Sequence, residues 1–166
     1  MGDRHAELLG AFDRHSRFTV EDGTVRLAGT PFTGAVDIGV NDETATYLIT
    51  VTAPSLDAVV TDQSVSEVIL AGWAETYERR IEGADGVTPE IATVDSDVEW
   101  DQHTLTVQMT VRRPATAPAP TDGIAALMQF IEGTYLQGVI PGYEYGPPVD
   151  KMLERARGRA VEDRAP

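Results

Sequence analysis

Cysteine is absent from this 166-residue chain, and lysine and asparagine occur only once each, as Lys151 and Asn41. A chain without cysteine forms no disulfide, has no thiolate to bind a metal and has no cysteine nucleophile. The sequence also has no apolar run near the ~20 residues that a membrane-spanning helix requires. We therefore expect a protein that is neither stabilised by disulfides nor inserted in a membrane.

Positive charge is the next scarcity. The chain has 27 acidic and 13 basic residues, so its net charge is -14. These charges repel one another in dilute buffer, whereas in roughly 1 M salt the Debye length is only about 3 Å and the repulsion is screened. Because lysine is depleted as well, the composition predicts a halophilic protein of a salt-rich cytoplasm; the alternative is an ordinary acidic protein. Residues 1–5 include no apolar signal region, which favours the cytoplasmic location.

The same shortage argues against nucleic-acid binding, which normally needs a basic stripe. Residues 147–166 are weakly basic, with five basic and four acidic side chains, and the rest of the chain is strongly acidic. The arginines of that last segment fit a solvated helix face. We therefore expect no nucleic-acid partner.

Motifs for catalysis, nucleotide binding and metal binding are missing too. The chain contains no G-x-S-x-G, no glycine-rich phosphate-binding loop and no H-x-x-x-H. Asp95, Asp97, Glu99 and Asp101 alternate along one stretch, but residues two apart on a strand lie about 7 Å apart, too far for a compact cation site. We expect no metal, no cofactor and no assignable catalytic residue, although a site recognised by geometry alone stays open.

Hydrophobic periodicity predicts two groups of strands that alternate with helices. A helix at 3–16 precedes short strands at 18–21 and 25–27, joined by a tight turn at Asp22-Gly23. Alternating segments at 36–40 and 46–53 follow. The next helix, at 65–81, has a capping box starting at Ser64 and an apolar face made of Val65, Val68, Ile69, Trp73, Tyr77 and Ile81.

The second half of the chain repeats this alternation. Its predicted parts are strands at 94–101 and 105–111, a proline-rich connector at 114–120, a helix from 121, a loop rich in glycine and tyrosine at 138–148, and a last helix from Pro148. The helix from 121 has its apolar face at Ile124, Leu127, Met128, Ile131 and Tyr135.

Separate runs of strands and helices are typical of α+β proteins. We expect an antiparallel sheet of about five to six strands with helices packed on it, in the order α-β-β-β(-β)-α-β-β-α-α. The length fits a single α+β domain, residues 1–157, followed by a frayed C-terminal tail, residues 158–166.

Two resemblances follow from this order and from three stretches of sequence. The element order resembles the fold of the small acidic chaperones of type III secretion, a likeness that implies little about function. The residues of Ala53–Val59, Gly72–Arg80 and Glu132–Tyr145 resemble an uncharacterised protein family of haloarchaea. No activity is assigned to that family, so this resemblance implies a haloarchaeal setting and no catalytic residue.

The loop rich in glycine, proline and tyrosine is the most unusual segment. Tyrosine combines apolar area with a polar tip, which suits recognition of a ligand or partner. Arg79 or Arg80, at the end of the 65–81 helix, could reach Glu132 and form a polar site beside Tyr135; the alternatives are surface ion pairs and a packed turn. The candidate ligand- or partner-binding residues are Trp73, Arg79, Glu132, Tyr135, Tyr143 and Tyr145.

These features together favour a non-catalytic protein-binding or interaction module, chaperone-like in fold, whose partner is another protein or a second copy of the chain. The alternative is a small enzyme or ligand-binding protein with a pocket near 132–145, marked by convergent polar groups and a perturbed pKa. The lack of a catalytic motif weighs against the enzyme.

The excess of negative charge leads to a prediction about salt. We expect cooperative folding in molar salt and a loss of stability on dialysis to low salt, because screening removes the repulsion among carboxylates. Thermal unfolding followed by circular dichroism in the two conditions measures this difference. An unchanged melting temperature would show that the fold does not need its charge to be screened.

Overall fold

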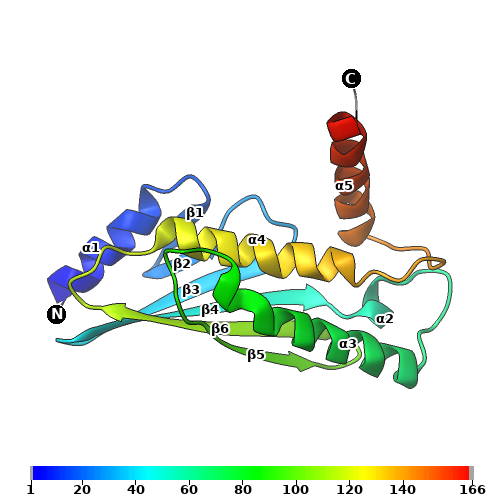
Figure 1. Ribbon diagram of the computed structural model, residues 1–166, viewed down its shortest axis with the longest axis horizontal. Coiled ribbons are helices and arrows are strands. Elements are labelled where there is room, and N and C mark those ends of the chain that lie inside the picture. The colour runs from blue at the N-terminus through cyan, green and yellow to red at the C-terminus, as the bar shows by residue number, and fades with distance from the viewer. Residues whose placement is uncertain (1, 165–166) are drawn as a thin grey trace.

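The computed structural model describes residues 2–164, with side chains described up to Gly158 (Figure 1). These residues form the α+β architecture that the sequence predicts. The helices are α1 (Gly2–Asp13), α2 (Leu56–Val59), α3 (Glu67–Ile81), α4 (Thr121–Gln137) and α5 (Val149–Arg164), with a 3-10 turn, η1 (Glu82–Gly86), after α3. The strands are β1 (Phe18–Glu21), β2 (Thr24–Leu27), β3 (Thr33–Val40), β4 (Thr44–Pro54), β5 (Asp95–Trp100) and β6 (Thr104–Pro114).

These six strands form one antiparallel sheet in the order β1-β2-β3-β4-β6-β5. Its longest pairing joins β4 to β6, from Thr44 opposite Pro114 to Pro54 opposite Thr104. The predicted turn between β1 and β2 is confirmed, because Asp22-Gly23 has the two positive φ angles, 51° and 78°, of a tight hairpin turn. Helix α3 carries the chain from β4 to the far edge strand β5, and β6 then returns beside β4.

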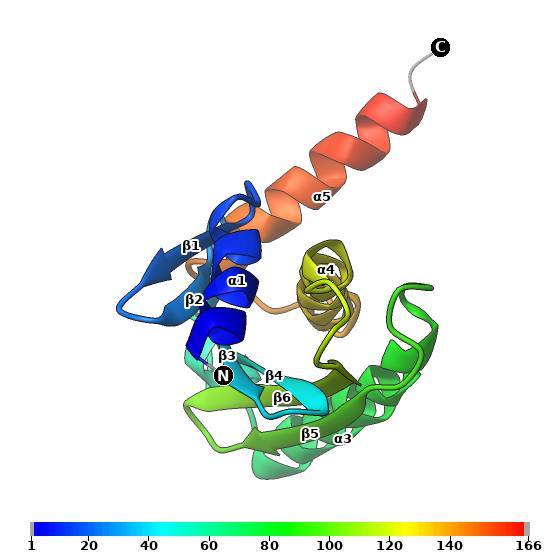
Figure 2. The ribbon, with the colours of Figure 1, turned by 90° about the vertical axis from the view of Figure 1, so that its left-hand side faces the viewer.

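The two faces of the sheet differ in what covers them. The inner face contains the buried alternate residues of β4 and β6, from Ala45 to Ala53 and from Leu105 to Val111. The sheet bends around α4, with α1 beside β1 to β3 and α3 beside β5 (Figure 2). The outer face carries threonines of β4 and β6 and the acidic side chains of β5, as the period-two pattern predicts.

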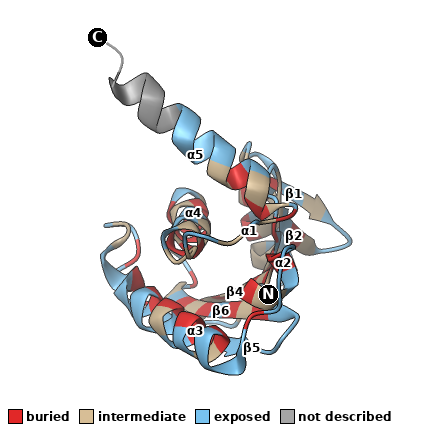
Figure 3. Cartoon of the chain, turned by 90° about the vertical axis from the view of Figure 1, so that its right-hand side faces the viewer, coloured by how far each residue is buried: buried red, intermediate tan, exposed pale blue. Residues whose placement is uncertain are grey.

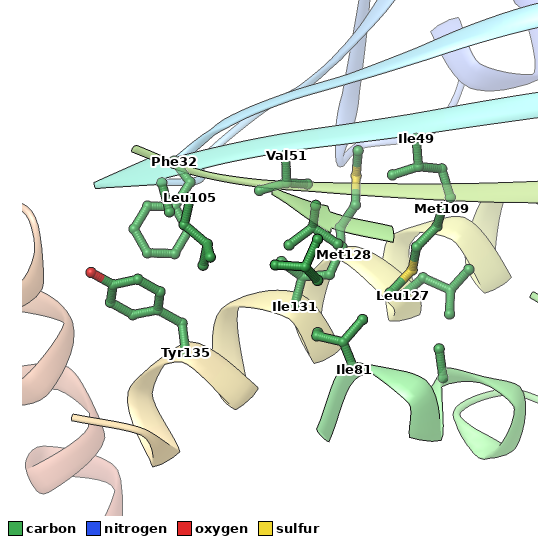
Figure 4. Packing of buried hydrophobic residues seen from close by; sticks show 14 of the residues in the cluster. Phe32, Ile49, Val51, Ile81, Leu105, Met109, Leu127, Met128, Ile131 and Tyr135 are labelled. Atoms are coloured by element: carbon green, nitrogen blue, oxygen red, sulfur yellow. The ribbon is translucent and has the colours of Figure 1, made fainter. Parts of the chain in front are cut away.

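Helix α4 occupies the centre of the core. Its predicted apolar face is confirmed, since the side chains of Ile124, Leu127, Met128, Ile131 and Tyr135 are all buried. They lie against the inner face of the sheet, and α3 adds a side chain to the same cluster (Figure 4). Complete burial of each large apolar side chain contributes about 1.5–3 kcal/mol, so this contact between sheet and helices is the main source of stability.

The first turn of α4 is stabilised by residues from elsewhere in the chain. Its N-cap, Pro120, has no side-chain acceptor, and the carboxylate of Glu90 accepts the backbone N–H of Gly123 at 2.8 Å instead. A carboxylate at this position also interacts favourably with the positive end of the helix dipole. The proline-rich connector before α4 is held by Arg4, which donates hydrogen bonds to two of its carbonyl oxygens.

The first turn of α3 differs from the prediction. Its N-cap is Ser66, whose hydroxyl accepts the N–H of Ile69 at 3.3 Å, rather than Ser64. Val68 is 84% exposed and Ile69 is 41% exposed, so the predicted apolar face is wrong at these two positions. Leu70 occupies the buried position, because α3 packs on the core with the adjacent side of the helix. Periodicity also does not predict the four-residue helix α2.

Helix α5 stands away from the body of the protein (Figure 1). Val149 and Met152 of its first turn are buried, whereas residues 154–158 are exposed (Figure 3). The tail predicted at 158–166 falls almost wholly outside the residues whose side chains are described, so its fraying stays a prediction. Within the described part of the chain, no helix combines the length and the apolar character needed to cross a membrane.

Two glycines of α4 provide a matched test of the packing. A Cβ at Gly123 would lie 2.9 Å from Cδ1 of Ile91 and 3.0 Å from the Glu90 carboxylate, whereas a Cβ at Gly133 would meet nothing within 4 Å. We expect Gly123→Ala to lower the free energy of unfolding by about 1–3 kcal/mol, and Gly133→Ala to raise it by up to about 1 kcal/mol, because alanine is the better helix former. Urea unfolding measures both values, and equal effects would contradict the close packing at Gly123.

Candidate functional site

A groove between α3 and the chain that leaves α4 is the first candidate site, and we call it the α3 groove. Its volume is about 360 Å³, large enough for a bulky side chain or a small ligand. Helix α3 forms one wall, because residues three and four apart lie on the same side of a helix. The residues that line the groove include Ile69, Trp73, Thr76, Arg80, Gln137 and Ile140.

Trp73 brings a buried polar atom to the α3 groove. Its side chain is 5% exposed and packs edge-on against Tyr135, with the ring centroids 5.6 Å apart. The indole Nε1 is buried and has no hydrogen-bond partner among the described residues. A Cβ at Gly138 would lie 3.5 Å from this nitrogen, so glycine here keeps the groove beside the indole open. A buried donor without an acceptor costs about 1–3 kcal/mol, and an acceptor on a bound group would offset that cost.

Tyr135, one of the predicted site residues, belongs to the core. Its hydroxyl donates to the carbonyl oxygen of Pro54 at 2.7 Å, and the Tyr77 hydroxyl donates to the carbonyl oxygen of Ile131 at 2.9 Å. Burial raises the pKa of both phenols above the usual value. Both tyrosines therefore stay protonated and serve as hydrogen-bond donors that connect α3, α4 and the end of β4.

The other two predicted tyrosines hold the loop after α4 in shape. The Tyr145 hydroxyl donates to the carbonyl oxygen of Ile140 at 2.7 Å and accepts the N–H of the same residue at 3.0 Å. Tyr143 is half-buried and packs edge-on against Tyr145, with centroids 6.5 Å apart. A β-bridge joins Tyr145 to Val60, and burial raises the pKa of Tyr145. The loop is a packed turn that presents Ile140 to the α3 groove.

The remaining two predicted residues, Arg79 and Glu132, lie apart. Arg79 is exposed on α3 and forms no ion pair with another described residue. Glu132 accepts a hydrogen bond from Thr30 and lines a different cleft. The next residue, Arg80, lines the α3 groove instead. The sequence offered Arg79 or Arg80 as a partner for Glu132, and Arg80 lines the groove without Glu132. Its spacing of seven from Trp73 places these two residues on one side of the helix.

The cleft that Glu132 lines is the second candidate site. It has a volume of about 440 Å³ and lies between α4, α5 and the segment 29–31 that precedes β3. Two arginines, Arg17 and Arg155, line it together with Glu132. No sequence signal brings these arginines together, because they lie at opposite ends of the chain.

The acidic residues of β5 form no metal site in the described part of the chain, where no three His, Asp or Glu side chains are grouped to hold an ion. Asp95, Asp97 and Glu99 are exposed on the outer face. The N–H groups of Thr104 and His103 hydrogen-bond to the Asp101 carboxylate and lower its pKa. Asp101 therefore stabilises the turn between β5 and β6.

Comparison with protein families finds a match over most of this architecture. The model of a family of unknown function, DUF5813, matches residues 13–155, from the end of α1 into α5. The chain belongs to this family. The match includes the α3 groove and the packed loop, so the candidate site is part of the family's own fold, and the expected membership of an uncharacterised family is confirmed. Comparisons with curated proteins and with solved structures find no match.

Substitution of two of the predicted site tyrosines separates a core role from a surface role. We expect Tyr135→Phe to lower the free energy of unfolding by about 1–2 kcal/mol, because the Pro54 carbonyl oxygen loses its buried donor. Tyr143→Phe should change it by less than about 0.5 kcal/mol, as is usual for surface substitutions. Chemical unfolding of both variants measures the difference, and equal values would place Tyr135 outside the core network.

Proposed function

We propose that this protein is a non-catalytic binding module and that the α3 groove takes a short segment of a partner protein. The observation that carries the proposal is the indole N–H of Trp73, which is buried beside the groove without an acceptor among the described residues. Buried polar groups are normally hydrogen-bonded. A partner that fills the groove and supplies a carbonyl oxygen would satisfy this donor.

Exposed apolar side chains flank the donor. Ile69 on α3 is 41% exposed and Ile140 is half-buried, and both line the groove. A single exposed apolar residue needs no explanation, but neighbouring ones around a groove are typical of interaction surfaces. Their removal from water would contribute roughly 25 cal/mol per Å² before the cost of ordering the partner is subtracted.

The polar lining indicates what the partner segment carries. Arg80 forms no ion pair with another described residue, so its guanidinium is free to bind a carboxylate. Thr76 and Gln137 can each donate and accept hydrogen bonds along an extended backbone. The segment that fits has a large apolar side chain, a free carbonyl oxygen for Trp73 and an acidic residue next to them.

The groove is poorly equipped for catalysis, which favours binding over the alternative of a small enzyme at 132–145. Within the described part of the chain, its lining has one hydroxyl, that of Thr76, and no imidazole, carboxylate or lysine to serve as a general base. A role as a chaperone would make the bound segment part of a client protein. The net charge of -14 suits a module that works in a salt-rich cytoplasm.

Photo-crosslinking from a defined position tests this proposal. We expect a photoreactive amino acid at position 140, which lines the groove opposite α3, to link to one protein segment, apolar and next to an acidic residue, when the probe is used in a lysate of the source cells. Ile69→Asp should abolish the link by placing a charge on the apolar wall. Trp73→Phe should weaken capture about five- to tenfold, because one hydrogen bond of about 1 kcal/mol is lost.

Glu75→Gln is the matched control, because Glu75 is exposed on the same helix and does not line the groove. It should capture the same segment as the wild type, and a photoreactive residue at position 75 should not link to it. Circular dichroism checks that each variant is folded. Equal capture by Ile69→Asp, or links only to a second copy of this chain, would overturn the proposal.

A further inference from the structure

The cleft between α4, α5 and segment 29–31, which we call the arginine cleft, differs from the rest of the molecule in its charge. Arg17, in the turn just before β1, and Arg155 on α5 both line its volume of about 440 Å³. Neither forms an ion pair with another described residue, although the chain has an excess of acidic residues and a net charge of -14. Two cationic side chains therefore face one cleft with their hydrogen-bond donors available.

One carboxylate, that of Glu132, also lines the cleft, but it is hydrogen-bonded to a residue other than the two arginines. Glu132 accepts a hydrogen bond from the hydroxyl of Thr30, a residue of the segment that precedes β3. This bond holds the carboxylate at the cleft wall, where it lines the cleft but forms no ion pair with either arginine. The two arginines thus exceed the single acidic group of the lining by one positive charge.

We propose that the arginine cleft binds a small organic phosphate. The planar guanidinium group donates two parallel hydrogen bonds to phosphate oxygens, and arginine is always charged. A phosphate monoester carries close to two negative charges near neutral pH. The two guanidinium groups offset these two charges, while the Glu132 carboxylate stays hydrogen-bonded to Thr30, so the occupied cleft carries about one net negative charge.

The rest of the lining accounts for an organic part of the ligand. Leu136 and the buried Met152 supply apolar surface, and Gln129 and Glu132 supply acceptors for hydroxyl or amino groups. The volume of about 440 Å³ lies in the range of small-molecule sites and exceeds what inorganic phosphate needs. The fitting ligand has a phosphate at the arginine end and hydrogen-bond donors on a compact body.

This site is independent of the proposed protein-binding function. The arginine cleft and the α3 groove share no lining residue, because one involves α5 and the other α3. A negative result in the test of one site therefore does not contradict the proposal for the other.

Titration of the isotope-labelled protein with three probes tests the inference. The ionic strength is kept constant at a value at which the protein is folded. The probes are ribose 5-phosphate, ribose and inorganic phosphate, and the readout is the Nε–Hε signals of the arginines by NMR. We expect ribose 5-phosphate to shift the signals of Arg17 and Arg155 saturably and to bind more tightly than inorganic phosphate. Ribose should shift neither signal.

A pair of double variants locates the effect. Replacing Arg17 and Arg155 by glutamine should weaken ribose 5-phosphate binding by at least about tenfold, because both charge-assisted contacts are lost. The control replaces Arg26 and Arg79, which are exposed outside the cleft, by glutamine and should bind as the wild type does.

Three results would overturn the proposal: no saturable shift with either phosphate, equal binding by the two double variants, or equal affinity for inorganic phosphate and ribose 5-phosphate. The last result would show that the cleft holds a free anion and does not recognise an organic body.

Discussion

The packing of α4 into the bend of the sheet positions every other described layer of the protein. One side of α4 covers the buried residues of β4 and β6, and the carbonyl oxygen of its Ile131 accepts the hydrogen bond that fixes Tyr77 of α3. A helix buried along this side must have its free N–H groups satisfied locally, which explains why Glu90 reaches its first turn. The two candidate clefts lie along the parts of α4, and of the chain after it, that the sheet leaves uncovered.

The polar atoms of the core explain why the α3 groove stands out. The hydroxyls of Tyr77, Tyr135 and Tyr145 each donate to a backbone carbonyl, so three aromatic residues serve packing and hydrogen bonding together. Two buried polar atoms of the described residues have no partner: the Tyr47 hydroxyl and the Trp73 indole nitrogen. Tyr47 lies on the buried face of β4, where burial raises its pKa more than the nearby Arg4 and Arg113 lower it. The Trp73 side chain lines the α3 groove.

The packing of the sheet and helices also decides which charged side chains face water and which line a cleft. The carboxylates of β5 lie on the outer face, where water hydrates them and where a cross-strand arginine, Arg112, pairs with Asp95 at 2.6 Å. Such exposed pairs contribute little to stability, so the acidity of this face reflects hydration more than folding. The arginines of the two clefts are different, because the surrounding helices hold them beside concave surfaces without a carboxylate partner among the described residues.

Local periodicity was sufficient to predict the α+β class, the β1–β2 turn, and the buried sides of β4, β6 and α4, since alternation directly records which side of an element meets the core. It was wrong for Val68 and Ile69, because the rotation of α3 is set by its contacts with α4 rather than by its own apolar residues. It also could not bring Arg80 of α3 beside Gln137 of α4, or Arg17 beside Arg155. Periodicity is a property of neighbouring residues, whereas the surfaces that stay open, and the side chains that meet there, follow from how the helices pack across a sheet whose strands are not in chain order.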